Sequence, residues 1–454
     1  MKLAVVPALA LPAAVAAHAA RDVHLHARQS AATGSSSAGS VTTPAAGALT
    51  TPSLTFTLLS TNPTAVPLTE IASGVSSFAT VAATTTFAAG TTPTFLPNAP
   101  ALPNGDRGAR PIKLPTLGQT PDPTSDQVKA WIQEVNNSGV TIPSFSPTNP
   151  GGCANNTAAA ADASRCWWTC GGCENNDVST CPNKLTWGLT YDDGPALHTG
   201  DLLNYLDSQN LKATFFVVGS RAISYPYLLQ EEFMAQHQIA VHTWSHPQMT
   251  TLTNEQVIAE LGWSKKIITD VTGVTPRYWR PPFGDVDNRV RAIAKALGLE
   301  TSLWTRISPT ATFDTGDFDI PGGLVTANQA LNNWEGIMAN ATTINTGFIV
   351  LEHDLFQQTV DLATGYILPD ALSRTPKITI EPIITCLGLP IRDAYIETND
   401  NSSNPVSSGS NAQTTKGTNS SGNSNTSAAV GVSAPASFIA LGLALLSSVA
   451  AFLL

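Results

Sequence analysis

Charge is scarce in this chain: only 12% of its 454 residues are Asp, Glu, Lys or Arg, and the formal net charge is -10. The sequence contains no stripe or cluster of basic residues. Because proteins bind nucleic acids largely through cationic side chains that contact phosphates, we expect no nucleic-acid partner. An acidic surface would instead tolerate a cationic polymer.

Residues 1–120 and 400–435 are poor in charge and rich in Thr, Ser, Ala, Pro, Gly and Asn. Such segments cannot bury enough apolar surface to offset the conformational entropy lost on folding. We therefore expect them to be disordered, with the first forming a Ser/Thr/Pro/Ala-rich stalk or propeptide. The remaining residues, about 125–398, suffice for one large core.

Both ends of the chain resemble targeting signals. Lys2 is followed by an apolar run and by the small-residue site Ala17-His18-Ala19, which is typical of a secretory signal peptide. Pro7 and Pro12 disfavour the alternative, a buried helix. Residues 436–454 are uncharged and apolar, with no basic residue after them.

Small residues precede this apolar tail, which is the layout of a GPI-anchor signal, with Asn425 as the predicted attachment residue. A tail-anchored transmembrane helix is the alternative. We thus predict a secreted protein on the outer face of the plasma membrane and in the cell wall, held by a GPI lipid. The predicted divisions are a signal peptide (1–19), a disordered segment (20–120), a disulfide-stapled extension (121–183), the main domain (184–398), a Ser/Thr/Asn-rich linker (399–427) and a removed anchor signal (428–454).

The six cysteines fit an exported chain, in which disulfides are favoured over zinc or redox chemistry. Fifteen pairings are possible and remain open. Since Cys386 lies far from the rest, one disulfide should tie the end of the domain to its beginning. The cysteines are Cys153, Cys166, Cys170, Cys173, Cys181 and Cys386; N-glycosylation sequons occur at Asn136, Asn155, Asn340, Asn401, Asn419 and Asn425.

Short apolar segments alternate with helical patterns from residue 184 onward, which predicts an α/β barrel or an open parallel sheet. Several reactive residues follow the strand segments directly, where such folds place their active sites. The expected strands are 185–190, 213–218, 239–242, 277–280, 300–304 and 348–351, and the expected helices are 124–136, 200–208, 226–237, 254–271, 287–297, 326–339 and 360–372.

Two motifs at strand ends predict a metal site: Asp192-Asp193 and, fifty residues later, His242 with His246. The main domain has five histidines, and three of them lie at motif positions. One aspartate and both histidines could bind a divalent cation, zinc or cobalt, and leave a position open for water and substrate. The other aspartate would serve as general base, which points to a hydrolase.

Further strand-end residues complete the predicted site. Arg280 precedes a rigid Pro-Pro turn and could orient the base carboxylate bidentately, although a surface salt bridge is the alternative. The backbone N–H of Phe283 could stabilise an oxyanion. His353 could protonate the leaving group, and Leu351 would shape a pocket the size of an acetyl methyl. Asp192, Phe283 and Leu351 are thus the predicted substrate-binding residues.

These segments, Tyr-Asp-Asp-Gly, His-Thr-Trp-Ser-His, Arg-Pro-Pro-Phe-Gly and Leu-Glu-His-Asp-Leu, resemble four motifs of the polysaccharide deacetylases, carbohydrate esterase family four. The resemblance covers about residues 184–390 and is closest to the fungal GPI-anchored chitin deacetylases. It implies a distorted (β/α) barrel and removal of acetyl groups from N-acetylglucosamine units of chitin or chitosan. The roles it implies are base for Asp192, metal ligands for Asp193, His242 and His246, and acid for His353.

The family's remaining motif departs from its usual pattern. Acidic residues normally follow a strand that ends in Trp, but Trp304 is followed by Thr-Arg-Ile-Ser-Pro-Thr-Ala, with Arg306 in the run. We expect the missing carboxylate to weaken catalysis, to shift substrate preference, or to be replaced by Asp314, Asp317 or Asp319 in the following loop. The alternatives to chitin N-deacetylation are removal of O-acetyl groups from another wall glycan and wall binding with weakened catalysis.

Overall fold

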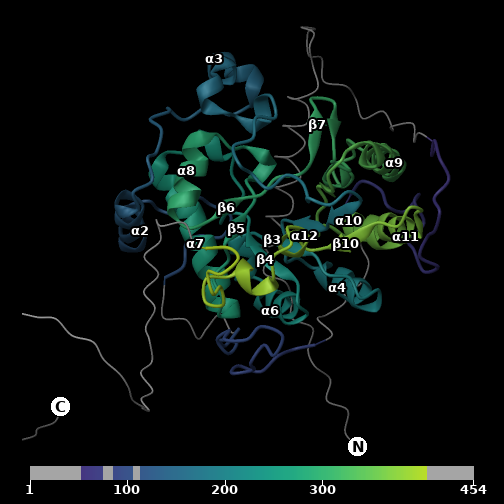
Figure 1. The fold of residues 1–454 in the computed structure, drawn as a ribbon, viewed down its shortest axis with the longest axis horizontal. Helices are drawn as coiled ribbons and strands as arrows, with labels where there is room; N and C mark the ends of the chain where they lie inside the picture. The colour runs from purple at the N-terminus through teal and green to yellow at the C-terminus, as the bar shows by residue number, and fades with distance from the viewer. Residues whose placement is uncertain (1–52, 75–84, 106–112, 406–454) are drawn as a thin grey trace, which may run out of the picture. The chain divides into compact units, whose positions relative to one another are not determined.

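Parallel strands form the centre of the computed structural model, which describes residues 53–74, 85–105 and 113–405 (Figure 1). Five strands pair in the order β2-β3-β4-β5-β6, and β1 pairs with β10 and β9 in a second parallel sheet. The strands are β1 (Thr186–Gly188), β2 (Thr190–Asp192), β3 (Thr214–Val217), β4 (Gln238–Val241), β5 (Tyr278–Trp279), β6 (Glu300–Thr301), β9 (Phe348–Ile349) and β10 (Thr379–Glu381).

Backbone hydrogen bonds on both sides of β9 join the two sheets. Thr305, just beyond β6, donates its N–H to the carbonyl of Ile349 at 3.0 Å. On the other side, β9 pairs with β1, and Asp192 N–H donates to Glu352 carbonyl at 3.0 Å. The strands therefore close into an irregular ring, which confirms the α/β class and the distorted (β/α) barrel.

Helices surround these strands in Figure 1. The longest of these helices is α7 (Asn254–Thr272). It begins at a capping box in which Thr253 and Gln256 exchange side-chain to backbone hydrogen bonds, and it ends at Gly273, whose φ is 84°. The helices around the barrel are α4 (Thr199–Ser208), α5 (Gly219–Ala222), α6 (Pro226–Met234), α7 (Asn254–Thr272), α8 (Asn288–Ala296), α9 (Ala327–Thr343), α10 (Gln357–Leu362), α11 (Leu368–Ser373) and α12 (Ile383–Cys386).

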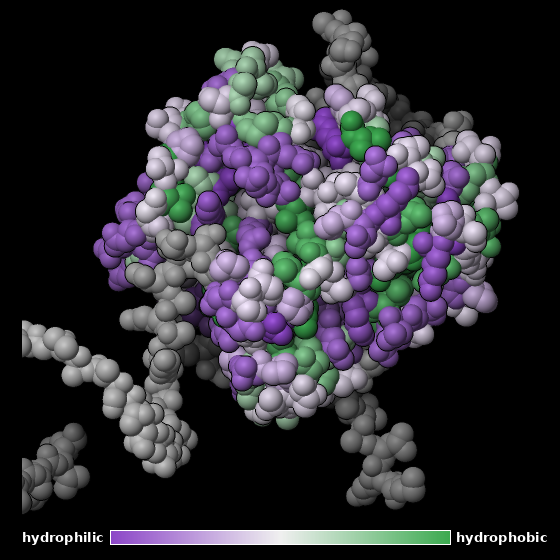
Figure 2. Space-filling view, in the orientation of Figure 1, coloured by the Kyte–Doolittle hydropathy of each residue, from purple (hydrophilic) through white to green (hydrophobic). Residues whose placement is uncertain are grey.

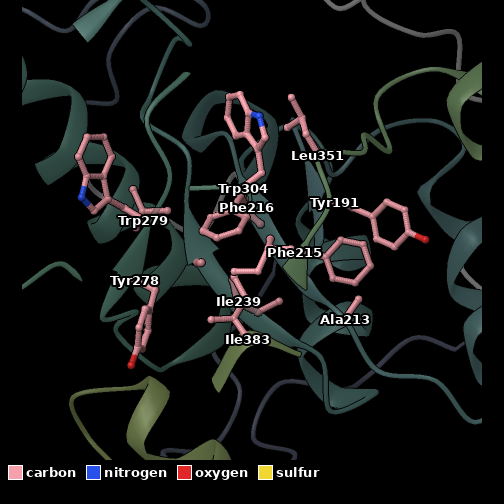
Figure 3. Packing of buried hydrophobic residues seen from close by; sticks show 14 of the residues in the cluster. Tyr191, Ala213, Phe215, Phe216, Ile239, Tyr278, Trp279, Trp304, Leu351 and Ile383 are labelled. Carbon is pink, nitrogen blue, oxygen red and sulfur yellow. The ribbon is translucent and has the colours of Figure 1, made fainter. Parts of the chain in front are cut away.

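The core lies on both faces of the strands, which explains why all four residues of β3 are buried rather than every second one. Successive side chains of a strand point to opposite faces. Figure 3 accordingly shows Phe216 near Trp304, while Phe215 lies beside Tyr191 at a ring-centroid distance of 5.7 Å. Phe216 faces the side of the strands that carries Arg280, whose guanidinium lies 4.2 Å from its ring centroid.

The segments 53–74 and 85–105 differ from the disordered stretch predicted over residues 20–120, because they pack against the main domain. Asn62 N–H donates to the carbonyl of Gly365 at 2.9 Å. The prediction of disorder from composition is wrong for these two segments, because widely spaced apolar residues can pack against an existing domain without forming a core of their own. The most buried of them, each at most 3% exposed, are Ile71, Leu96 and Leu102.

Three disulfides staple the described chain: Cys153–Cys170, Cys166–Cys173 and Cys181–Cys386. The last spans 205 residues and confirms the predicted tie between the end of the domain and its beginning. The N-terminal extension of the barrel contains α2 (Asp126–Asn137), which begins at the N-cap Ser125, and α3 (Thr157–Ala161). Trp131 of α2 packs edge-on against Trp263 of α7 at 5.5 Å.

The face drawn in Figure 2 mixes hydrophobic and hydrophilic residues, with hydrophobic residues in a band near its centre and in smaller patches. In the described ranges, no helix is long and apolar enough to cross a membrane. The predicted signal peptide and anchor signal lie outside the described residues. The large apolar side chains that are most exposed come from separate segments: Leu59, Tyr227, Ile307 and Leu324.

Candidate active site

Three potential metal ligands meet at the carboxyl ends of β2 and β4. Asp193 Oδ1 lies 3.3 Å from His242 Nε2 and 3.1 Å from His246 Nε2. Their ligand atoms all lie within 4.8 Å of one another. One carboxylate oxygen and two imidazole nitrogens form a donor set suited to zinc or cobalt, with coordination positions left for water and substrate. The residues present therefore fit a divalent cation.

Local backbone geometry aims these side chains at one another. Asp193 and His246 have φ values of 79° and 59°, in the left-handed region that residues other than glycine rarely adopt. His242 Nδ1 hydrogen-bonds the carbonyl of Arg280 at 2.8 Å, so its Nε2 is the nitrogen that faces Asp193. This hydrogen bond joins the residue that follows β4 to the residue that follows β5.

The electrostatics favour an ionised Asp193. Burial by itself raises the pKa of this carboxyl, but the charge of His246 and hydrogen bonds from His242 and His246 outweigh it. They hold the pKa of Asp193 well below its usual range. An anionic, buried carboxylate beside two imidazoles is what a divalent cation requires of its ligands.

Asp192 has different partners from Asp193, although the two are adjacent. Arg280 Nη1 donates to Asp192 Oδ1 at 2.7 Å and to Thr190 Oγ1 at 2.9 Å. Arg280 is fully buried, and its Nη2 donates to the carbonyl of Leu303 at 3.2 Å. The contact with Asp192 is made by one guanidinium nitrogen rather than the bidentate pair predicted. Asp192 is nevertheless fixed 3.9 Å from His242 Nε2, beside the potential metal ligands.

Phe283 lies in η6 (Pro282–Gly284), with φ 59° and ψ 13°. Its ring packs edge-on against the His246 ring at 4.6 Å. Pro281 and Pro282 have no N–H, so the amide of Phe283 is the first backbone donor of this loop after Arg280. The loop thus brings the ring of Phe283 against a potential metal ligand.

His353 follows β9 and is bound by a carboxylate, as an acid with a fixed tautomer would be. Its Nδ1 lies 2.8 Å from Asp317 Oδ1, and its backbone N–H donates to Asp317 Oδ2 at 2.9 Å. Burial lowers the pKa of His353, but the charge and hydrogen bond of Asp317, with the charges of Asp193 and Asp192, prevail and raise it to about 10. The carboxylate of Asp317 thus favours the protonated form of this imidazole.

Asp317 supplies the carboxylate that appeared to be missing after Trp304. The chain inserts a hairpin, β7 (Arg306–Ser308) and β8 (Ala311–Thr312), before it reaches η7 (Asp317–Asp319). The sequence left Asp314, Asp317 and Asp319 as alternatives, and the contact with His353 selects Asp317. Arg306 turns away from these carboxylates: its Nη1 donates to the carbonyl of Trp168 at 3.3 Å.

The remaining predicted site residues are placed as follows. Leu351 is 6% exposed and donates its N–H to the carbonyl of Phe313, on the same rim as His353. Figure 3 shows Leu351 beside Trp304. Asn419 and Asn425 lie outside the described residues. The other sequon asparagines are exposed or partly exposed: Asn136, Asn155, Asn340 and Asn401.

Comparison with known proteins agrees with this geometry. Residues 179–302 match the family model of polysaccharide deacetylase. Chitin deacetylase 1 of Cryptococcus neoformans var. grubii is 48% identical over 356 residues, which are 77% of this chain and 74% of that one. A chitin deacetylase of Amylomyces rouxii is 40% identical over 239 residues, 46% of this chain and 54% of the relative.

A solved structure, the chitin deacetylase of the fungal pathogen Colletotrichum lindemuthianum, is 23% identical with a TM-score of 0.43 over 49% of this chain and 96% of that one. The identity and coverage of the Cryptococcus relative establish the family. The chain belongs to the polysaccharide deacetylases and is a hydrolase.

Proposed function

We propose that this protein removes acetyl groups from N-acetylglucosamine units of chitin or partly deacetylated chitosan, releasing acetate, with zinc or cobalt as its metal. The observation that carries the proposal is the division of labour between adjacent aspartates. Asp193 faces two histidines, whereas Asp192 is held by Arg280. The relatives named as chitin deacetylases supply the substrate class.

A cation bound by Asp193, His242 and His246 would polarise the acetamido carbonyl and lower the pKa of water. The other steps belong to the chain's own residues. Asp192, held by Arg280, accepts a proton from the attacking water. The amide of Phe283 donates a hydrogen bond to the oxyanion as the tetrahedral centre forms.

Collapse of the tetrahedral centre requires a proton on the departing amine nitrogen. His353, protonated and oriented by Asp317, supplies it as the C–N bond breaks. Acetate and a glucosamine unit are the products. Leu351, on the rim beside His353, provides apolar surface for the acetyl methyl.

We further propose that the protein acts outside the cell, anchored by a GPI lipid in the plasma membrane and extending into the wall. The apolar sequences at both ends support this placement. Disulfides in the described domain suit an exported protein. Release of the protein from intact cells by a phosphatidylinositol-specific phospholipase checks the anchor; continued retention would contradict it.

Acetate release by the purified protein tests the activity. We expect acetate from N-acetylglucosamine oligomers and from partly acetylated chitosan, and little from an O-acetylated xylan. The reverse preference would favour an O-deacetylase. Tight binding to chitin without acetate release would favour a wall-binding protein, and either result would overturn the proposal.

A further inference from the structure

Residues 153–173, which we call the disulfide cap, enclose two consecutive tryptophans. The disulfides Cys153–Cys170 and Cys166–Cys173 place a half-cystine on each side of the segment Trp167–Thr169. Both tryptophans are buried, at 4% and 3% exposure. The segment is therefore fixed at both ends and immersed in the protein rather than displayed to solvent.

The enclosed segment contacts the residues that follow Phe283. Trp167 Nε1 donates to Asp285 Oδ1 at 2.7 Å. The backbone N–H of Trp168 donates to the carbonyl of Val286 at 3.0 Å, and Thr169 Oγ1 donates to the carbonyl of Gly284 at 3.1 Å. Residues 284–286 are thus held by hydrogen bonds from three consecutive residues of the disulfide cap.

Packing at Gly284 is equally restrictive. A Cβ atom there would lie 2.3 Å from Trp168 and 3.0 Å from Trp304, so only glycine fits beneath the two indoles. Gly284 has φ 62° and directly follows Phe283, itself at φ 59°. Glycine adopts this conformation freely, but for Phe283 it is costly unless the surroundings hold the residue in place. Trp168 supplies those surroundings.

Asp285 also connects the disulfide cap to the loop that follows His246. Asp285 is 2% exposed, and its carboxylate also accepts the N–H of Thr250 at 2.9 Å, four residues beyond His246. A buried carboxylate is costly unless its hydrogen bonds are satisfied, so Trp167 and Thr250 are coupled through Asp285. The disulfide cap thereby links the loops that carry Phe283 and His246.

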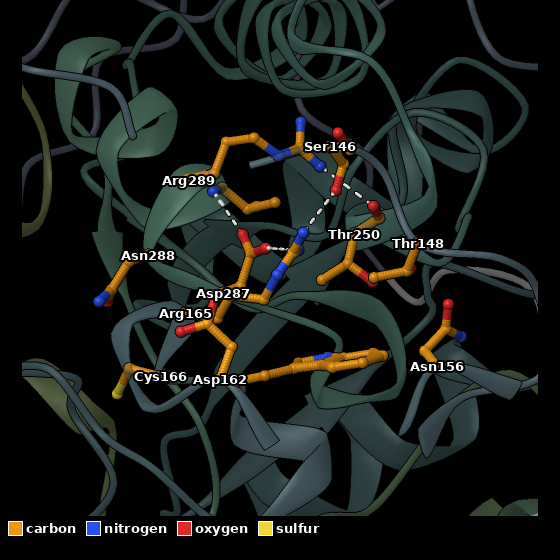
Figure 4. A network of polar contacts seen from close by, with 12 residues as sticks. Ser146, Thr148, Asn156, Asp162, Arg165, Cys166, Thr250, Asp287, Asn288 and Arg289 are labelled. Carbon is orange, nitrogen blue, oxygen red and sulfur yellow. Dashed lines mark hydrogen bonds and ion pairs between the residues drawn. The ribbon is translucent and has the colours of Figure 1, made fainter. Parts of the chain in front are cut away.

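Charged residues fasten the outside of the disulfide cap to α8 and its N-cap. Arg291 Nη1 donates to the carbonyl of Cys166 at 2.6 Å, and Arg165 Nη1 pairs with Asp287 Oδ2 at 3.1 Å. Figure 4 shows Arg165 bridging Asp287 and Ser146. The disulfide cap is therefore bound both to residues 284–286 and to α8, which follows them in the chain.

We propose that Trp167 and Trp168, locked by the two disulfides of the cap, are positioning residues that hold the backbone amide of Phe283 in its catalytic orientation. This inference rests on the proposed function. The tryptophans contact Gly284, Asp285 and Val286 and act through these residues. Loss of the disulfides should therefore slow turnover more than it weakens substrate binding or metal binding.

The test compares steady-state kinetics of three paired Cys→Ser variants on N-acetylglucosamine oligomers. Two variants remove Cys153–Cys170 or Cys166–Cys173. The matched control removes Cys181–Cys386, which lies beside Gly188, the last residue of β1, and Gly347, just before β9. We expect kcat to fall roughly tenfold or more in the cap variants, with KM within about twofold, since an oxyanion donor acts mainly in the transition state.

Metal content and thermal unfolding separate this role from a loss of folding. We expect the cap variants to bind zinc as the wild type does and the control to keep kcat. Unchanged kcat in both cap variants would overturn the inference, as would an equal kcat loss in the control at the same folded fraction. Failure of the wild-type protein to release acetate would overturn the proposed function itself and this inference with it.

Trp167→Phe provides a second test that leaves the disulfides intact. It keeps the aromatic packing but removes the N–H that binds Asp285. We expect a several-fold lower kcat with unchanged zinc binding. A kcat equal to that of the wild type would show that the hydrogen bond does not orient the loop.

Discussion

Adjacent residues can take opposite roles when the backbone turns between them. Asp192 ends β2 in extended conformation, whereas Asp193 adopts φ 79°. The turn directs one carboxylate to Arg280 and the other to the two histidines. Mutations at these positions should therefore separate proton transfer from metal binding.

Asp192→Asn should fold and retain zinc but lose at least about a hundredfold in kcat, because an amide cannot accept the proton of the attacking water. Kinetics on N-acetylglucosamine oligomers, together with metal analysis, measure this. Turnover at the wild-type rate would assign the base to another group.

His246→Ala should lose stoichiometric zinc, because it removes one of the protein ligands at the site. Metal analysis after gel filtration measures this without reference to activity. His198→Ala is a suitable control, since His198 lies in the same domain and pairs with Asp201 rather than with the cluster. Full zinc content in the His246 variant would refute the ligand assignment.

Asp317→Asn should shift the basic limb of the kcat profile to lower pH. The anionic carboxylate raises the pKa of His353, so its removal lowers that pKa, and His353 loses its proton at lower pH. Activity that requires protonated His353 then declines earlier as pH rises. The pH profiles of the two proteins, compared at equal zinc occupancy, decide this; coincident basic limbs would contradict the role of Asp317.

Sequence could propose the ligands but could not select the partner of His353. The acid pair and the histidines stand directly after buried strands, a position that parallel folds use for their active sites. Asp317, by contrast, comes after an inserted hairpin, and three aspartates in that loop were equally plausible. Only the three-dimensional path of the loop brings Asp317 to within 2.8 Å of His353 Nδ1.

Among the elements, strands and helices were predictable where apolar periodicity was sustained. The expected helix 254–271 corresponds to α7, with its capping box in place. β10 and the β7–β8 hairpin were not anticipated, because such short strands leave little periodic signal. The packed segments 53–74 and 85–105 were missed because composition does not reveal docking on a neighbouring surface.

One of these docked segments should contribute to stability without contributing to catalysis. Leu96 is 1% exposed, so Leu96→Ala should lower the free energy of unfolding by about 2–4 kcal/mol. Leu59→Ala is the matched control: Leu59 is 59% exposed and should change it by less than about 0.5 kcal/mol. Denaturant unfolding measures both, and equal, small effects would show that the segment is not stably docked.

The molecule as a whole joins a hydrolytic site at the carboxyl ends of the barrel strands to an N-terminal extension that is stapled and packed against it. The family, the hydrolase class and the barrel were predictable from motifs at strand ends. The contacts between the disulfide cap and the Phe283 loop were not, because six cysteines leave fifteen pairings open and sequence does not rank them.

The most direct test of the account is acetate release from N-acetylglucosamine oligomers while zinc is titrated into chelator-treated protein. We expect negligible release from the metal-free protein and recovery that saturates at about one equivalent of bound zinc per chain. Asp193→Ala should neither bind zinc nor recover. Acetate release at the full rate by the metal-free protein would contradict the account.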